Sequence, residues 1–414
     1  MEKNCIIAQS GGPTAAINAS LAGIINKIIT DREFEHIYGA VHGIQGVLRE
    51  NFLDLTKSTP EFISRLKITP AMYLGSCRFK LPAVSEDITL YREIFNIFDK
   101  MNVGAFFYIG GNDSMDTVDK LSEYASSIGS NIQIAGIPKT IDNDLMCTDH
   151  TPGFGSAAKY VACSVREIAY DTYIYDLESV TIVEIMGRDA GWLTAASCLA
   201  RSEAALAPHL IYLPEVAFDT GNFISDLKRL LPIHKNLIVA VSEGIHDKEG
   251  TYLSAAEAAS DRFGHAQLSG AGKYLEHLVK ETLGVKVRSV EINVLQRCAG
   301  HLCSKTDLDE AFALGGHAVT LVKEGQTGFM TTLIRTGNNP YKCTLSSIPV
   351  NQTANKAKAV PRSFINADGN DVTGEMQEYL APLIAGEVET AYIDGVPSYL
   401  EVPHLLQKNK GLSQ

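Results

Sequence analysis

The stretch CIIAQSGGPTAAINASLAGIINKII, residues 5–29, joins a short apolar run to a polar turn and then to a longer segment with apolar residues at helical spacing. The run 5–8 predicts a buried strand, and 15–29 predicts a helix that follows the turn 11–14. The same unit recurs along the chain. This alternation predicts an α/β protein with a largely parallel sheet.

A second apolar run at 104–109 leads into the turn GGNDS, residues 110–114, and another helical segment. The pattern predicts that Ser114 caps this helix. Further strands are expected at 132–137, 180–186 and 237–242. Because ligands of open α/β sheets bind beyond the carboxyl ends of the strands, we expect the turns after these strands to form one active-site rim.

The composition is that of an ordinary globular protein. The 414 residues are 45% hydrophobic and 20% charged, and this length predicts two or three domains. The formal net charge of −12 argues against a nucleic-acid partner. No apolar run approaches the roughly 20 residues that cross a bilayer, and the first residues do not resemble a signal peptide. We therefore expect a cytoplasmic protein without a membrane partner.

The eight cysteines form no CxxC pair, which favours a reducing compartment. Cys298, His301 and Cys303 are close in sequence, but the further pair of ligands that a zinc site needs is missing. The cysteines therefore do not predict a metal centre.

The turn 10–14, SGGPT, ends a predicted strand and opens a helix, so backbone N–H groups and the helix dipole can hold a phosphate there. A simple tight turn is the alternative. The glycine spacing lacks the GxGxxG pattern of dinucleotide-binding proteins, so a nicotinamide-dependent oxidoreductase is supported by the α/β pattern alone.

The turn 110–114 carries a carboxylate where a phosphate site would favour none. Asp113 can stabilise the helix N-terminus. If this turn faces the same ligand as the turn 10–14, Asp113 instead limits the size and charge of that ligand.

The segment PKTIDND, residues 138–144, concentrates charge at the end of a predicted strand. On an extended backbone Asp142 and Asp144 point to the same face, with Asn143 opposite. One carboxylate can accept a proton from a substrate hydroxyl, while the other binds a cation or shifts the pKa of the first. Lys139 can neutralise them or contact a transferring phosphoryl group. A structural ion-pair cluster is the alternative.

With SGGPTAAIN (10–18), GGNDS, PKTIDND and MGRDAG (186–191) in this order, the chain resembles the 6-phosphofructokinases over roughly residues 5–330. The resemblance implies an α/β fold of two doubly wound, largely parallel domains with a C-terminal extension. The implied division is 1–145 plus about 297–340 for the phosphoryl donor, 146–296 for fructose 6-phosphate, and 341–414 as an extension packed on the body.

The resemblance implies a phosphotransferase that moves a phosphoryl group to the 1-hydroxyl of fructose 6-phosphate with Mg²⁺, forming fructose 1,6-bisphosphate. Asp142 matches the family's general base and Thr140 a substrate-contacting threonine, and Lys139 and Arg188 complete the expected catalytic set. The positions that match fructose 6-phosphate contacts are Thr140, Asp142, Met186, Gly187, Arg188, Glu243, Arg288 and Arg297. Arg288 matches an arginine that reaches across from a neighbouring subunit, which implies a homodimer or homotetramer.

The residues that match donor contacts are Gly11, Gly12, Arg78, Asp113 and Lys139. Family members that use ATP usually have glycine at the positions of Asp113 and Lys139, whereas members that use pyrophosphate have this Asp and Lys pair. Asp113 would repel and crowd the α-phosphate of a nucleotide, and Lys139 can supply positive charge to pyrophosphate. The resemblance thus implies a reversible pyrophosphate-dependent reaction.

Asn112 stands where many family members have an aspartate associated with Mg²⁺. The expected metal ligands are therefore Asn112 and Asp142. Two alternatives stay open from the sequence: an ATP-dependent 6-phosphofructokinase and a non-catalytic regulatory subunit.

Overall fold

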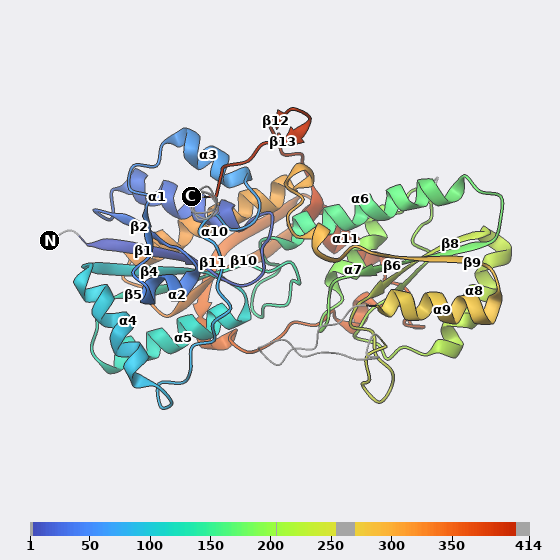
Figure 1. Ribbon diagram of the computed structural model, residues 1–414, viewed down its shortest axis with the longest axis horizontal. Helices are drawn as coiled ribbons and strands as arrows, with labels where there is room; N and C mark the ends of the chain where they lie inside the picture. Colours follow the sequence, from blue (N-terminus) through green and yellow to red (C-terminus); the bar gives the residue numbers. More distant parts are fainter. Residues whose placement is uncertain (1–2, 204, 254–269, 403–414) are drawn as a thin grey trace, which may run out of the picture.

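The computed structural model describes residues 3–203, 205–253 and 270–402. Two β-sheets follow one another along the long axis of the molecule, and helices cover both faces of each sheet (Figure 1). The fold is thus the predicted α/β class, confirmed down to the parallel strands.

The larger sheet has the strand order β11-β10-β5-β4-β1-β2-β3. Its strands are β1 (Asn4–Gln9), β2 (Ile37–Ala40), β3 (Phe52–Asp54), β4 (Val103–Gly110), β5 (Gln133–Pro138), β10 (Phe329–Asn338) and β11 (Tyr341–Pro349). The interior pairs are parallel, and the two edge strands β3 and β11 are antiparallel to their neighbours. β4 is buried along its whole length, because helices cover both faces.

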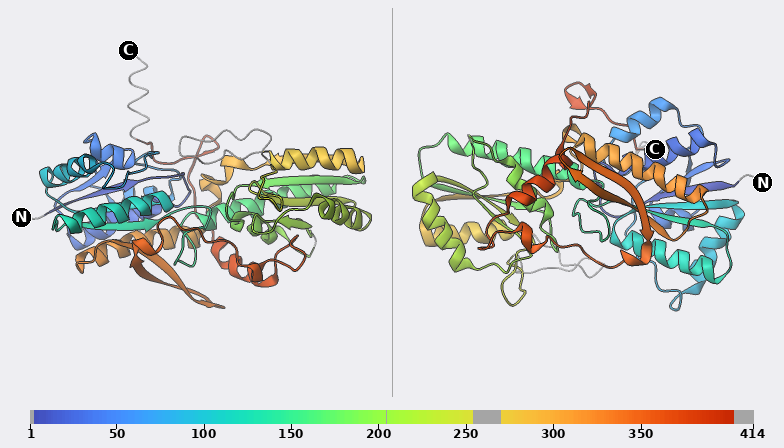
Figure 2. Two further views of the ribbon diagram at one scale, coloured as in Figure 1. Left: turned by 90° about the horizontal axis from the view of Figure 1, so that it is seen from below. Right: turned by 180° about the vertical axis from the view of Figure 1, so that it is seen from behind.

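The smaller sheet has the order β7-β8-β6-β9, with every pair parallel. Its strands are β6 (Ser179–Ile185), β7 (Leu210–Tyr212), β8 (Asn236–Ser242) and β9 (Lys286–Glu291). A short hairpin, β12 (Tyr392–Ile393) and β13 (Val396–Pro397), stands apart from both sheets (Figure 2).

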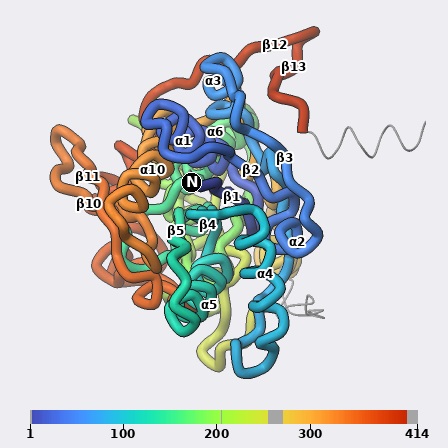
Figure 3. Tube along the Cα trace, turned by 90° about the vertical axis from the view of Figure 1, so that its left-hand side faces the viewer, coloured from blue at the N-terminus to red at the C-terminus, as the bar shows by residue number. Residues whose placement is uncertain are grey.

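The larger sheet is packed between helices of amphipathic pattern. These are α1 (Ile17–Asp31), α3 (Pro60–Ile68) and α10 (Lys305–Lys323) on one face, and α2 (Gly43–Leu48), α4 (Ile88–Lys100) and α5 (Asn112–Ser127) on the other. The trace seen end-on separates the two groups (Figure 3). Their buried aliphatic and aromatic side chains form two continuous cores.

The smaller sheet is covered in the same way. Its helices are α6 (Phe154–Tyr173), α7 (Trp192–Ala196) and α11 (Gly374–Leu380) on one face, and α8 (Thr220–His234) and α9 (Ala271–Leu283) on the other. Single turns of 3₁₀ helix occur at η1 (Ser197–Ala200), η2 (Asn293–Gln296), η3 (Gly300–Leu302), η4 (Val350–Gln352), η5 (Arg362–Phe364) and η6 (Ala381–Ile384).

The predicted strands are all present within one or two residues, but the predicted cap of the helix after β4 is wrong. α5 begins at Asn112 with Gly111 at its N-cap, and no side chain caps it. Ser114 is instead buried in the first turn, against Gly110, where a Cβ would lie 1.9 Å from the Ser114 hydroxyl. The helix starts earlier because the Gly111 carbonyl already accepts from the N–H groups of Ser114 and Met115, both at 3.0 Å.

The C-terminal part of the chain belongs to both halves of the molecule. β10 and β11 form a hairpin at the edge of the larger sheet, so 341–349 continue this sheet past the expected boundary at 340. The chain then crosses to the smaller sheet, where Met376 and Leu380 of α11 join its core (Figure 2). The last expected residues of the extension, 403–414, lie outside the described residues. The division into domains stays a prediction.

Within the described ranges, none of the helices combines the length and the apolar character that a membrane span requires.

Candidate active site

The polar turns predicted to form the site follow adjacent parallel strands. The turns 10–14, 110–114 and 139–144 follow β1, β4 and β5, which are neighbours in the larger sheet, and 186–191 follows β6 of the smaller sheet. The carboxyl ends of parallel strands meet at one edge, so each sheet gathers its own turns.

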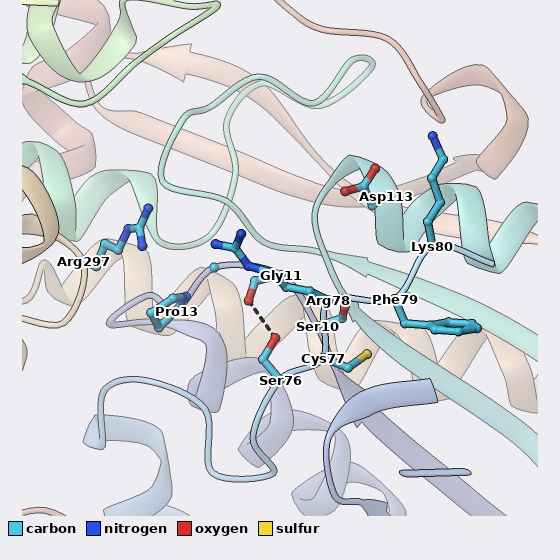
Figure 4. Close-up of a pocket in the computed structure, with 11 residues that line it drawn as sticks. Ser10, Gly11, Pro13, Ser76, Cys77, Arg78, Phe79, Lys80, Asp113 and Arg297 are labelled. Carbon is cyan, nitrogen blue, oxygen red and sulfur yellow. Dashed lines mark hydrogen bonds between the residues drawn. The ribbon is translucent and has the colours of Figure 1, made fainter. Parts of the chain in front are cut away.

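The turns after β1 and β4 border a cavity of about 330 Å³ (Figure 4). Its lining residues are Ser10, Gly11, Gly12, Pro13, Ser76, Cys77, Arg78, Phe79, Lys80, Asp113 and Arg297. The structure therefore brings together four of the five residues expected to contact the donor. It also places Arg297 on the wall of the same cavity.

Gly11 is required at its position for two reasons. Its φ of +84° is a left-handed conformation that favours glycine. A Cβ on Gly11 would also lie 2.8 Å from the Lys139 ammonium nitrogen. The glycine turn and the lysine thus fit against each other closely, and a side chain at Gly11 would displace the lysine.

Lys139, the fifth expected donor residue, lies beneath this turn rather than on the open cavity wall. Its side chain is buried, and its Nζ donates to the Gly12 carbonyl at 2.8 Å. Burial lowers the pKa of Lys139 to about 8, and Asp142 and Asp144 oppose this shift. A group with this pKa is mostly protonated at neutral pH, so a positive charge lies directly behind the turn.

Asp142 is held by the threonine two residues before it. Its N–H donates to the Thr140 hydroxyl oxygen at 3.1 Å, and that hydroxyl donates to the Asp142 carboxylate at 3.4 Å. Burial raises the pKa of Asp142, whereas the charges of Arg297 and Lys139 oppose the increase. A half-buried carboxylate in this setting suits proton acceptance from a hydroxyl.

The backbone assumed for this segment is wrong. Asn143 has a φ of +54°, so 142–144 form a turn and not an extended strand, and β5 has already ended at Pro138. The turn forms because the buried Asn143 side chain accepts from the Thr151 N–H at 3.1 Å. The two carboxylates nevertheless interact, since burial and then Asp142 raise the pKa of Asp144 to about 7.

The turns after β6 and β8 are joined by hydrogen bonds. Gly187, with a φ of +137°, donates its N–H to the Glu243 carboxylate at 3.3 Å and accepts from the Ser242 hydroxyl. Burial raises the pKa of Glu243 to about 7, and Asp142 contributes to the increase. Arg188 lies in the same turn as Met186, and its charge acts on both Asp142 and Glu243. The structure thus brings these two turns toward Asp142.

Arg288 does not line the cavity between the turns after β1 and β4. It is exposed on β9, in register with Thr181 of β6, and its guanidinium pairs with Asp171 at 3.2 Å. Its expected contact with fructose 6-phosphate stays a prediction.

Sequence reasoning missed part of the cavity wall. Ser76, Phe79 and Lys80 line the cavity, and the Ser76 hydroxyl donates to the Gly11 carbonyl at 2.8 Å (Figure 4). The signal that could have found them is the pair of basic residues, Arg78 and Lys80, in a polar loop.

The residues present fit a magnesium ion. The Asn112 side-chain oxygen is buried and has no hydrogen-bond partner in the described structure, while its amide nitrogen donates to the Lys356 carbonyl at 2.9 Å. This oxygen and the carboxylates of Asp142 and Asp144 are of the type that Mg²⁺ prefers. No set of three or more His, Cys, Asp or Glu side chains in the described ranges could hold a metal.

Comparisons with known proteins agree with this geometry. The family profile described as "Phosphofructokinase" matches residues 4–322. The pyrophosphate--fructose 6-phosphate 1-phosphotransferase of Xanthomonas campestris pv. campestris (strain B100) is 41% identical over 410 residues, 98% of each chain. The enzyme of the same name from Rhodospirillum rubrum is 42% identical, over 94% of this chain and 95% of the relative.

A solved structure has the same fold over almost the whole chain. The pyrophosphate-dependent phosphofructokinase from Nitrosospira multiformis superposes with a TM-score of 0.88 at 37% identity, covering 97% of this chain and 96% of that one.

Proposed function

The chain belongs to the phosphofructokinase family, and we propose that it is a pyrophosphate:fructose 6-phosphate 1-phosphotransferase. The observation that carries the donor assignment is the buried Lys139 ammonium behind the glycine turn, with Asp113 on the same cavity. The relatives of this name, aligned over nearly the full length, support the assignment. The resemblance found in the sequence is thereby confirmed at the level of the family.

In the proposed reaction the 1-hydroxyl of fructose 6-phosphate attacks one phosphorus of pyrophosphate. The new bond joins O1 to that phosphorus, the bridging P–O bond breaks, and phosphate leaves with the electron pair. Asp142 accepts the hydroxyl proton, held in place by Thr140. Because phosphoryl transfer needs mainly positioning and charge neutralisation, the chemistry suits a site built from turns and cations. The reverse reaction uses the same groups.

On the donor side, the N–H groups of the turn at Gly11 and Gly12, with Arg78 and Lys139, would hold pyrophosphate. Lys139 adds a positive charge where negative charge shifts during transfer. Asp113 places a carboxylate on the cavity wall, where a nucleotide's α-phosphate would be repelled. Pyrophosphate is shorter and avoids this contact.

On the acceptor side, Met186, Gly187 and Glu243 would position the sugar, and Arg188 and Arg297 would neutralise its phosphate. Mg²⁺, if bound by Asn112 and Asp142, would supply charge neutralisation for the pyrophosphate oxygens. These residue roles are proposals that follow from the geometry described above.

We also propose a homodimer or homotetramer, in which Arg288 reaches a neighbouring site. The exposed position of Arg288 on β9 supports this. A cytoplasmic location fits the eight free cysteines and the metabolites of the proposed reaction.

The test is fructose 1,6-bisphosphate formation by the purified chain, with Mg²⁺ and fructose 6-phosphate and either pyrophosphate or ATP. We expect activity with pyrophosphate and little with ATP. Activity with ATP alone would overturn the donor assignment, and no activity with either would favour a regulatory subunit.

A further inference from the structure

One segment of the C-terminal extension crosses the candidate active site. This segment, residues 356–360, is here named the strap. The Lys356 carbonyl accepts from the Asn112 side chain at 2.9 Å, and the Lys358 N–H donates to the Asp144 carbonyl at 2.7 Å. The strap therefore contacts the turn after β4 and the segment after β5 within three residues.

The Lys358 side chain points into the body of the protein, and its ammonium group has three hydrogen-bond acceptors there. Its Nζ donates to the Asn143 side-chain oxygen at 3.3 Å, the Thr148 carbonyl at 3.1 Å and the Asp149 carbonyl at 2.7 Å. An ammonium has three N–H groups, so three acceptors satisfy it. It also lies 5.2 Å from the ring centre of Trp192, whose indole N–H donates to the Lys358 carbonyl at 2.9 Å.

Asn143 links this ammonium to the chemistry. It lies between the two carboxylates of the site, in the left-handed conformation that forms their turn. Its side-chain oxygen accepts from the Thr151 N–H and from Lys358, and its amide nitrogen donates to the Tyr379 hydroxyl at 3.3 Å. Two of these groups, Lys358 and Tyr379, come from the C-terminal extension. The C-terminal extension thus holds the Asn143 side chain, and this side chain stabilises the turn 142–144.

We propose that Lys358 is a positioning residue for phosphoryl transfer, which acts through Asn143 to hold Asp142 and Asp144 in their working orientation. The inference rests on the proposed function. It gives a role to an extension for which the sequence indicated none.

The competing explanation is that Lys358 only attaches the extension to the body. The two explanations differ in what the loss of the ammonium changes. An attachment role predicts lower thermal stability with normal turnover per folded molecule. A positioning role predicts lower turnover with unchanged substrate affinity, because a displacement of about 1 Å at reacting groups can cost roughly 10²-fold in rate.

The experiment compares Lys358→Met with Lys342→Met in the full-length chain. Lys342 is an exposed lysine on β11 of the same extension, and it serves as the matched control. We expect Lys358→Met to lower kcat by about 10- to 100-fold. KM for fructose 6-phosphate and for pyrophosphate should stay within about threefold, and the control should behave as the wild type. Equal kcat per folded molecule for both variants would overturn the proposal.

A second measurement keeps the proposal testable if Lys358→Met folds poorly. Asn143→Gly removes the linking side chain but suits the left-handed backbone. If Lys358 acts through Asn143, the double variant should lose about as much kcat as the more impaired single variant. If the fold-loss in kcat of the double variant equals the product of the two single losses, Lys358 does not act through Asn143.

The wild-type result separates this proposal from the proposed function. If the wild type forms no fructose 1,6-bisphosphate from pyrophosphate, the function itself fails. If the wild type is active and Lys358→Met turns over normally, the positioning role alone fails.

Discussion

The two halves of the candidate site place their charged groups differently. On the donor side, the turns after β1 and β4 border an open cavity, and Arg78 and Asp113 are exposed on its wall. On the acceptor side, the turns after β6 and β8 are hydrogen bonded to each other, and the Glu243 side chain is half-buried.

This difference indicates different ways of recognising a ligand. An open cavity with exposed charges of both signs selects a donor by size and charge, and salt screens part of that selection. A half-buried carboxylate that accepts from the Gly187 N–H selects by geometry, because an unpaired polar group costs more in a desolvated setting. Asp142 lies between the two halves, because its pKa responds to charges from both, Lys139 on the donor side and Arg188 on the acceptor side.

Removing the group shared by both halves should have the largest effect. Asp142→Asn keeps the size of the side chain but cannot accept the hydroxyl proton as a carboxylate does. We expect kcat to fall by about 10²- to 10⁴-fold. Steady-state kinetics with pyrophosphate, together with the Tm of the variant, measure this loss. A folded variant with near-normal turnover would remove Asp142 from the base role.

Lys139→Met should impair the use of pyrophosphate more than the binding of fructose 6-phosphate. The variant removes the buried charge behind the glycine turn, so kcat/KM for pyrophosphate should fall by about 10²- to 10³-fold. KM for fructose 6-phosphate should change far less. Lys80→Met, on the exposed wall of the same cavity, is the control and should lose much less. Equal losses in the two variants would contradict a special role for the buried lysine.

Variants at Asp113 should show whether the size or the charge of this side chain excludes a nucleotide donor. We expect Asp113→Gly to raise the low activity with ATP by about tenfold, since both crowding and repulsion are removed. Asp113→Asn keeps the size and removes the charge, so the comparison separates the two causes. The measurement is the ratio of kcat/KM for ATP and pyrophosphate. No change in this ratio, even with Lys139→Gly added, would show that other residues exclude the nucleotide.

The smallest effect should appear in the pH dependence of stability. Burial raises the pKa of Glu243 from 4.5 to about 7. The folded protein therefore keeps this proton at pH values where the unfolded chain has lost it, and stability falls as pH rises from 4.5 to 7. Glu243→Gln has no carboxyl proton to release, so its Tm should fall less than that of the wild type between pH 5 and pH 7.5. A steeper loss in the variant would contradict the burial of a neutral carboxyl.

The sequence alone determined the α/β class and the family motifs. Apolar runs followed by polar turns and helical segments predicted β1, β4, β5, β6 and β8 within one or two residues, because burial on both sheet faces requires continuous apolar runs. The motifs around Gly11, Asp142 and Arg188 also identified the family by their resemblance to those of the 6-phosphofructokinases, and the family profile over residues 4–322 confirms that resemblance.

Only the tertiary structure decided how these motifs meet. It showed that Lys139 lies behind the glycine turn, that Asn143 bends the segment between the two aspartates, and that the strap from the C-terminal extension reaches this bend. These contacts join residues up to 215 positions apart in the sequence. Local patterns report burial and turn propensity, but such long-range hydrogen bonds depend on how the two sheets and the extension pack in space.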